Sequence, residues 1–168
     1  ARRAGRLGMD ADSVATWVEG RLASLRAVDR LGALASGADL VIEAAPEALD
    51  VKQAVFRSLD AAAGADVILA TNTSALSVAA IAAATRRPER VLGLHCFNPV
   101  PVMALVEVVV TDVVAPRHVE RAEAIVRAWG KVPIRCADTP GFIVNRVNRP
   151  FTIEALRMLT HHQGALQL

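Results

Sequence analysis

Short apolar runs alternate with amphipathic segments along this 168-residue chain, and this alternation constrains the fold more than any other feature. A short apolar run rich in β-branched residues indicates a buried strand, whereas apolar residues at helical spacing indicate a helix. Such runs predict strands over residues 39–45, 66–71, 91–95, 105–110 and 132–136. Amphipathic segments predict helices over residues 9–30, 46–63, 77–85 and 117–129. The alternation indicates an α/β domain with a mostly parallel sheet.

The pattern changes after Pro140-Gly141, where one long helical stretch runs from Phe142 to about Leu159 and no strand follows it. We therefore predict a domain boundary here, with residues 1–138 in the α/β domain and residues 139–168 at the start of a helical domain. Pro150 is expected to kink this helix, because proline removes one backbone donor and crowds the preceding turn.

Composition argues against several classes of partner. With 53% hydrophobic residues the chain is expected to form a packed core, and its net charge of +2 includes no dense basic block for nucleic acid. No apolar stretch reaches the length that crosses a membrane. Cys96 and Cys136 lack the spacing of a metal or redox pair, so we expect reduced thiols, no metal site and a cytoplasmic location.

A histidine and a glutamate in consecutive predicted strands carry the strongest chemical signal. His95 ends its strand and is followed by Cys96-Phe97-Asn98-Pro99, which predicts a rigid loop. Glu107 lies among valines and leucines in the next strand, where a buried carboxylate needs a partner. A carboxylate bound to an imidazole fixes the histidine tautomer, as a general base working near neutral pH requires. We therefore predict that His95 and Glu107 form a pair.

Two other strand ends carry small or polar residues. The hydroxyl-rich loop around Ser74 follows a strand, and open α/β sheets bind ligands outside the carboxyl ends of their strands. Ser77 in the same segment is expected to cap the next helix. At the second strand end, Ala44 is small enough for a ligand to approach closely. Glu47 and Lys52 then either bond a ribose or phosphate group, or form an ordinary helix start with a solvated lysine.

Five segments in consistent order make the chain resemble the 3-hydroxyacyl-CoA dehydrogenase family. They are residues 39–47, the loop from Thr71 to Ser74, the loop from Gly93 to Pro99, Glu107, and the run from Asp138 to Arg146. The resemblance covers about residues 35–159. It implies a partial Rossmann-like NAD domain followed by the first helix of an all-α domain. It also implies an active site between the two domains and a homodimer formed through the helical domain.

The resemblance implies catalytic roles for four residues. His95 would be the general base that takes the 3-hydroxyl proton while hydride leaves the same carbon for NAD, and Glu107 would orient its imidazole. Ser74 and Asn145 would hydrogen-bond the acyl-CoA substrate around its hydroxyl and thioester carbonyl. Without the resemblance, Asn145 would be interpreted as part of an exposed helix face.

The resemblance also implies a set of cofactor contacts. Asn98 would lie beside the nicotinamide, and Glu47 and Lys52 would contact NAD on its ribose side. Ala44 would let the cofactor approach the strand end. Each of these residues would contribute position and electrostatics, since the hydride chemistry belongs to the cofactor.

The chain departs from the family pattern at its start, because it has no GxGxxG turn to bind a pyrophosphate. We therefore expect an internal fragment, inactive alone, of an NAD-dependent (S)-3-hydroxyacyl-CoA dehydrogenase of fatty-acid β-oxidation or 3-hydroxybutyryl-CoA metabolism. Two alternatives stay open. One is a dehydrogenase of the same fold that acts on a free hydroxy acid. The other is a truncated, non-catalytic domain for binding or assembly.

Overall fold

The computed structural model describes residues 10–161, and the chain divides into two compact units at Arg30. In the first unit, α1 (Ala11–Ala23) begins where the Asp10 carboxylate accepts a 2.7 Å hydrogen bond from the Ser13 N–H. It ends where the Ser24 hydroxyl donates to the carbonyl of the preceding turn. The helix predicted over residues 9–30 is thus shorter than expected, and residue 9 lies outside the described residues.

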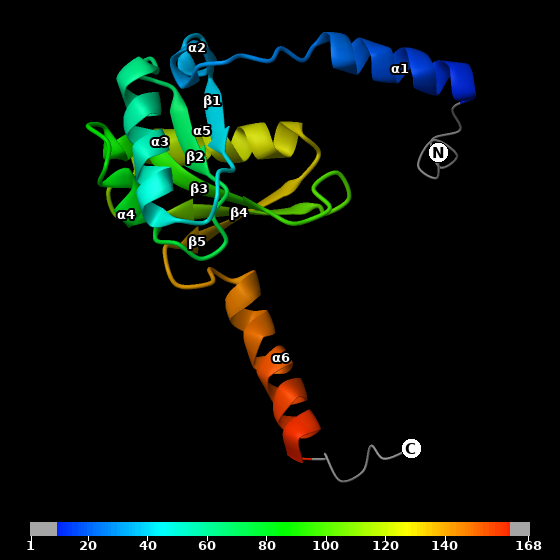
Figure 1. Ribbon diagram of the computed structural model, residues 1–168, viewed down its shortest axis with the longest axis vertical. Coiled ribbons are helices and arrows are strands. Elements are labelled where there is room, and N and C mark those ends of the chain that lie inside the picture. The colour runs from blue at the N-terminus through cyan, green and yellow to red at the C-terminus, as the bar shows by residue number, and fades with distance from the viewer. Residues whose placement is uncertain (1–9, 162–168) are drawn as a thin grey trace. The chain divides into compact units, whose positions relative to one another are not determined.

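The second unit is built around a five-stranded sheet (Figure 1). Its elements are α2 (Leu31–Ala35), β1 (Leu40–Glu43), α3 (Leu49–Ala62), β2 (Ile68–Thr71), α4 (Val78–Ala82), a 3₁₀ turn (Pro88–Arg90), β3 (Val91–Cys96), β4 (Leu105–Val110), α5 (Pro116–Ala128), β5 (Val132–Ala137) and α6 (Val144–His161). The strands are ordered β1-β2-β3-β4-β5, and only the β3–β4 pair is antiparallel. The prediction of an α/β fold with a mostly parallel sheet is confirmed.

Two local details differ from the sequence prediction. The short helix α2 was not expected, and α3 begins at Leu49 in place of residue 46. Glu47 stays outside the helix because its carboxylate is held by the neighbouring loop through Thr73 and Ser74. The helix predicted after Phe142 is observed as α6, which includes Pro150, and the expected kink there stays a prediction. In the described part of the chain, no helix is both long and apolar enough to cross a membrane.

Each face of the sheet carries its own apolar layer, because successive side chains of a strand point to opposite faces. On one face α3 and α4 cover the strands, and on the other face α5 covers them. The first layer includes Val41, Leu69 and Val91 with Phe56, Leu59 and Ile81, and the second includes Leu92, Leu94, Val106 and Val108 with Val119, Ala122 and Val126. His95 comes two residues after Gly93 in β3, and Glu107 comes two residues before Val109 in β4. Side chains two residues apart in a strand point to the same face, so His95 and Glu107 both lie on the α4 face.

Gly93 in β3 is packed too closely for any side chain. A Cβ added there would lie 2.7 Å from the Cβ of Val109 and 3.2 Å from the Cγ2 of Val78. We expect Gly93→Ala to lower the free energy of unfolding by about 1–3 kcal/mol, because an overpacked core must shift. Urea denaturation measures this loss. Gly64→Ala is the matched control, since its Cβ would make an ordinary 3.6 Å contact, and equal stability of the two variants would contradict the expectation.

Candidate active site

His95 and Glu107 face each other across the β3–β4 pair. The antiparallel register places them directly opposite, and opposite residues of such a pair point to the same face. The Nδ1 atom of His95 lies 2.6 Å from Oε2 of Glu107. Both side chains are buried, with 5% of His95 and 0% of Glu107 exposed. The predicted pairing is confirmed, and it leaves Nε2 as the ring nitrogen that can accept a proton.

The second oxygen of Glu107 binds the start of α6. Oε1 accepts hydrogen bonds from the backbone N–H groups of Ile143 (2.9 Å) and Val144 (2.8 Å). One carboxylate therefore connects His95 in the sheet with the first residues of the last helix. These N–H groups have no partner within α6, and a carboxylate at a helix N-terminus is favourable.

Two aromatic rings lie next to the imidazole of His95. The ring centre of Phe97 is 4.6 Å away and that of Phe142 is 5.6 Å away. Phe142 is buried, whereas Phe97 lies in the loop after β3. The rings restrict access of water to the pair, and electrostatic interactions strengthen when water is excluded.

Ser74 and Asn145 meet at the same edge of the sheet. The side-chain amide of Asn145, in the first turn of α6, donates a 3.2 Å hydrogen bond to the backbone carbonyl of Ser74. Ser74 lies in the loop after β2 and is exposed. This contact joins two residues 71 positions apart, and both come from elements adjacent to the His95 pair. The structure thus brings all four residues predicted to be catalytic to one region.

The ammonium group of Lys52 is buried in a second polar cluster. It contacts Oε1 of Glu43 at 2.8 Å, the carbonyl of Ala45 at 3.1 Å and Oε2 of Glu47 at 3.3 Å. The other oxygen of Glu43 accepts a 2.7 Å hydrogen bond from the Thr71 hydroxyl. Only 1% of the Lys52 side chain is exposed, which excludes the solvated lysine that the sequence left open. Three acceptors match the three donors of an ammonium group.

Glu47 links this cluster to the loop after β2. Its Oε1 accepts hydrogen bonds from the Thr73 hydroxyl and, at 2.9 Å, from the Ser74 N–H. Burial acts to raise the pKa of Glu47, but the hydrogen bonds from Thr73, Ser74 and Lys52 outweigh it and lower that pKa. The carboxylate is therefore ionised at neutral pH, and 45% of its side chain remains exposed to a ligand. Ser74 thus contacts Glu47 through its N–H and Asn145 through its carbonyl.

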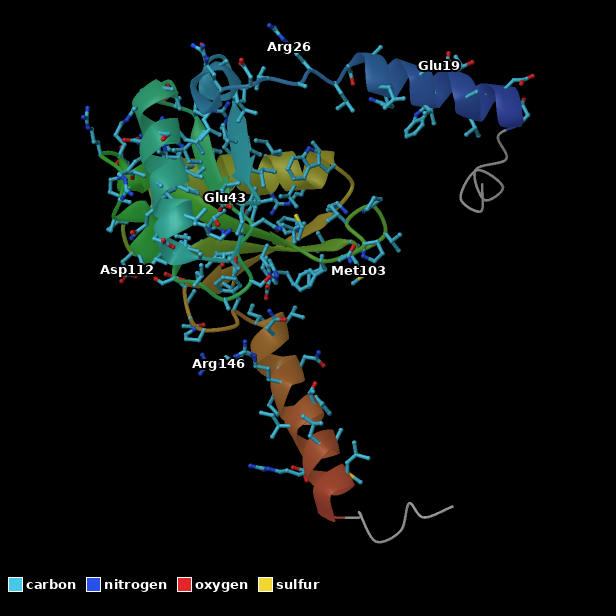
Figure 2. All side chains as sticks on the ribbon, viewed as in Figure 1. Glu19, Arg26, Glu43, Met103, Asp112 and Arg146 are labelled. Carbon is cyan, nitrogen blue, oxygen red and sulfur yellow. The ribbon has the colours of Figure 1, made fainter. Side chains whose placement is uncertain are left out.

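Asn98 lies in the loop that joins β3 to β4 and is exposed, two residues after the end of β3. Further along, this loop exposes Val102 and Met103, the second of which is labelled in Figure 2. Lys131 holds the loop in place, since its ammonium group donates to the carbonyls of Val100 (2.5 Å) and Met103 (2.7 Å). Ala44, at the end of β1, is likewise exposed.

The sequence comparison assigns the family. Residues 6–139 match the model of the family described as 3-hydroxyacyl-CoA dehydrogenase, NAD binding domain. The chain belongs to this family. It is 51% identical to 3-hydroxyadipyl-CoA dehydrogenase of Escherichia coli (strain K12) over 147 residues, which are 88% of this chain and 31% of that protein. It is 44% identical to the mitochondrial hydroxyacyl-coenzyme A dehydrogenase of Homo sapiens over 142 residues, which are 84% of this chain and 45% of that protein.

Solved structures of other proteins share the fold. FadB2 of M. tuberculosis has a TM-score of 0.88 at 37% identity, over 99% of this chain and 57% of that one. The 3-hydroxybutyryl-CoA dehydrogenase of Escherichia coli K12 has a TM-score of 0.85 at 48% identity, over 95% of this chain and 33% of that one. The chain thus spans about a third to a half of the curated relatives it matches.

Two residues that shape this candidate site were missed from the sequence. Glu43 lies in an apolar strand, as Glu107 does, and the same signal of a lone buried carboxylate could have found it. Asp138 accepts hydrogen bonds from the Ser77 hydroxyl and from the first N–H groups of α4. No local pattern marks Asp138, because its partners are about 60 residues away. Ser77 itself caps α4, as predicted.

The cysteines of the dehydrogenase domain are not suited to thiolate chemistry. Burial, together with nearby Glu107 and Asp138, raises the pKa of Cys136 to about 12. Burial also raises the pKa of Cys96. Both thiols are therefore protonated at neutral pH, and a protonated thiol is a poor nucleophile. Within residues 10–161, no three His, Cys, Asp or Glu side chains gather in a way that could hold a metal ion.

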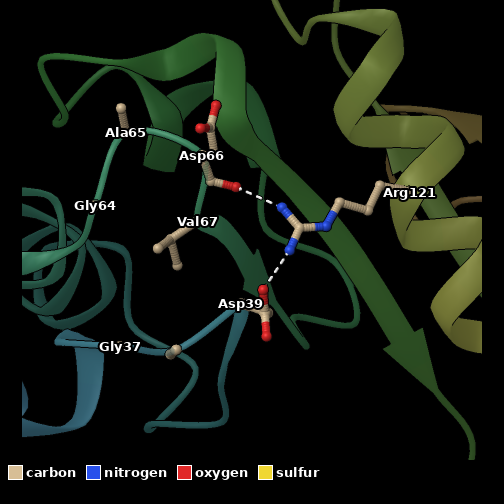
Figure 3. A pocket seen from close by; sticks show the side chains of 8 residues that line it. Gly37, Asp39, Gly64, Ala65, Asp66, Val67 and Arg121 are labelled. Carbon is tan, nitrogen blue, oxygen red and sulfur yellow. Dashed lines mark hydrogen bonds and ion pairs between the residues drawn. The ribbon is translucent and has the colours of Figure 1, made fainter.

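A further cavity lies at the opposite edge of the sheet, before β1 and β2 begin (Figure 3). There the guanidinium of Arg121 donates to the Asp66 carbonyl (2.9 Å) and to the carboxylate of Asp39 (2.5 Å). Asp39 is mostly exposed, and the contact joins α5 to the loops on which β1 and β2 start. Ligands of parallel sheets bind at the carboxyl ends of the strands, so this cavity is not part of the candidate active site.

Proposed function

We propose that this chain carries the general base and the nicotinamide side of the NAD site of an (S)-3-hydroxyacyl-CoA dehydrogenase. The observation that carries the proposal is the buried His95–Glu107 pair, which lies close to Ser74 and Asn145. The family match supports NAD as the cofactor. The curated relatives' names support a 3-hydroxyacyl-CoA as the substrate.

In the proposed reaction His95 removes the proton of the substrate's 3-hydroxyl group. Its Nδ1–H donates to Glu107, so Nε2 carries the lone pair that accepts this proton. The O–H bond and the C–H bond at the same carbon break, and a C=O bond forms. When bound, NAD supplies the acceptor for the hydride. Glu107 then stabilises the positive charge on the protonated imidazole, as the carboxylate of a catalytic triad does.

Ser74 and Asn145 are proposed to hold the substrate next to His95. Both carry groups that can bond the 3-hydroxyl and the thioester carbonyl, and their mutual contact fixes the amide of Asn145 at the edge of the sheet. Holding the reacting atoms in one geometry lowers the entropic cost of the reaction.

The proposed cofactor contacts are Asn98, Glu47 and Ala44. An ionised, half-exposed Glu47 fits a ribose hydroxyl, which is a hydrogen-bond donor, and the small Ala44 leaves the strand end open. Because Lys52 already has three acceptors in the protein, we propose that it acts on the cofactor through Glu47. Breaking this buried ion pair would leave an uncompensated charge.

The helix α6 exposes a series of apolar side chains, including Val147, Phe151, Leu156 and Leu159. A surface of this kind supports packing against other helices. It is in line with a homodimer formed through a helical domain, which we propose as the assembly of the whole protein.

NADH absorbance with acetoacetyl-CoA as the substrate tests the proposed function. The assay uses this chain and a chimera that adds the segments found on both sides of the matched region in the E. coli relative. We expect turnover by the chimera and little by the 168-residue chain, because NAD affinity depends on a phosphate-binding turn. Circular dichroism and NAD titration establish that the chimera is folded and binds cofactor.

The same assay separates the alternatives. A folded chimera that binds NAD, leaves acetoacetyl-CoA unchanged and reduces a free keto acid would identify a dehydrogenase of free hydroxy acids. A folded chimera that binds NAD and acts on neither substrate would favour a non-catalytic domain.

A further inference from the structure

We propose that Gly141 and Phe142 are positioning residues, because their turn aims the first N–H groups of α6 at Glu107 and so sets the tautomer of His95. The inference rests on the proposed role of His95 as the general base. Neither residue contacts the reacting C–H or O–H group of the proposed substrate. The turn before α6 would affect catalysis only through Glu107 and His95.

The backbone of this turn has an unusual conformation. Gly141 has a φ of 77° and Phe142 a φ of 47°, so two consecutive residues are left-handed. Phenylalanine rarely adopts a positive φ, because its Cβ then crowds the following carbonyl. The Phe142 N–H donates a 2.9 Å hydrogen bond to the Thr139 carbonyl, which closes the turn. The next two N–H groups, of Ile143 and Val144, then point at Oε1 of Glu107.

Packing holds Phe142 in this conformation. Only 2% of the residue is exposed, and it shares a cluster with Val78, Val109 and Cys136 on the α4 face of the sheet. Its ring also contacts the imidazole of His95 at a centre-to-centre distance of 5.6 Å. Burial of an aromatic side chain is one of the largest apolar contributions a residue makes, and it offsets backbone strain.

Space around Gly141 is equally restricted. A Cβ added there would lie 3.3 Å from the Arg146 backbone nitrogen and 3.4 Å from the Cβ of Asn145. The turn is therefore packed against the first turn of α6, which carries Asn145 itself. A larger residue at position 141 would have to displace this turn as well as adopt a left-handed φ.

The turn controls both oxygens of Glu107 together. With Oε1 bound by two N–H groups, the carboxylate cannot rotate freely, and Oε2 remains directed at Nδ1 of His95. Without those donors a buried oxygen would lose its partners, and the carboxylate would turn to recover them. His95 would then lose the fixed acceptor that keeps its proton on Nδ1.

Nitrogen-15 NMR of the imidazole tests this directly in the 168-residue chain, without cofactor or substrate. At a pH at which His95 is neutral, the wild type should show a protonated Nδ1 and a bare Nε2. We expect Gly141→Val to abolish this single tautomer, so that both nitrogens give intermediate shifts. The amides of Ile143 and Val144 should exchange with solvent about tenfold faster or more, since each loses a bond to a charged acceptor.

Three variants make the result specific. Gly130→Val meets the same left-handed constraint at φ 72° with nothing within 4 Å, and it should leave the His95 tautomer unchanged. Gly141→Asn should retain more of the single tautomer than Gly141→Val, because asparagine tolerates a left-handed φ and only the close Cβ contacts then disturb the turn. Glu107→Gln serves as the reference for the opposite tautomer, since an amide N–H facing Nδ1 requires that nitrogen to be bare.

The inference is overturned if Gly141→Val keeps a single Nδ1–H tautomer, or if Gly130→Val shifts it equally. If Gly141→Val does not fold, Gly141→Ala and Gly130→Ala take the places of the two valine variants. Because the measurement needs no turnover, failure of the proposed dehydrogenase activity would be seen separately in the NADH assay.

Discussion

Replacement of His95 by glutamine is expected to lower the kcat for acetoacetyl-CoA by about 10²–10⁴-fold, the usual contribution of a general acid or base. Glutamine is similar in reach and can occupy the space beside Glu107, but it cannot exchange a proton near neutral pH. The KM should change little, because Ser74 and Asn145 are proposed to hold the substrate. Steady-state NADH kinetics of the chimera measure both constants.

His118→Gln is the matched control for this prediction. His118 is also buried, at 2% exposure, and lies in α5, which packs against the opposite face of the sheet. Burial lowers the pKa of His118, an effect that nearby Arg117 increases, so the residue is neutral at neutral pH and glutamine replaces it without loss of charge. A His95→Gln variant that keeps more than a tenth of wild-type kcat would contradict a general-base role.

Replacement of Asp60 by alanine is expected to lower the free energy of unfolding by about 3–5 kcal/mol, the usual cost of breaking a buried ion pair. Arg90 is fully buried, and its guanidinium lies 2.6 Å from the Asp60 carboxylate, which is 3% exposed. Asp60 also accepts a 2.9 Å hydrogen bond from the Arg86 N–H. Its removal would leave the buried cation without a carboxylate. Urea denaturation measures the loss, with the exposed Asp112→Ala as the control.

The same ion pair predicts how stability depends on pH. Burial acts to raise the pKa of Asp60, but the hydrogen bond from Arg86 and the pairing with Arg90 outweigh it and lower that pKa below its ordinary value of 3.8. A lowered pKa stabilises the fold above the unfolded-state value, and this stability is lost as the pH falls through the folded-state value. The difference between wild type and Asp60→Ala should therefore shrink below about pH 4.

A double variant distinguishes the cost of the unpaired charge from the cost of lost packing. Asp60→Leu with Arg90→Met removes both charges and should recover part of the stability that Asp60→Ala loses, because hydrophobic residues can replace a buried pair at little cost. If the double variant is no more stable than Asp60→Ala, the loss comes from packing and not from the unpaired charge.

Local pattern was enough to predict most of the fold. Three elements were predicted to within one residue: the strands over residues 91–95 and 105–110 and the helix over residues 117–129. Burial of one face spaces apolar residues at a regular interval, and this spacing is visible in the sequence. The helix predicted over residues 9–30 was too long, because apolar spacing continues after the Ser24 cap has ended the helix.

The surroundings of Lys52 and the pairing of β3 with β4 could not be predicted from local pattern. The sequence at the start of a helix does not show which strand the helix packs against. Lys52 was therefore compatible with either a solvated or a bound lysine. Only the packing of α3 against the sheet buries its ammonium group on Glu43. The antiparallel β3–β4 pair was likewise invisible in either strand alone.

By itself, the sequence determined the order of the strands and of the longer helices, the α/β class and the residues of the His95–Glu107 pair. His95 and Glu107 were predictable as a pair because a lone carboxylate in an apolar strand needs a partner. Only the tertiary structure decided that Glu107 also binds the start of α6, 36 and 37 residues further along the chain. Secondary structure depends on neighbours a few residues apart, whereas contacts of this range depend on strand register and on how a turn directs the chain.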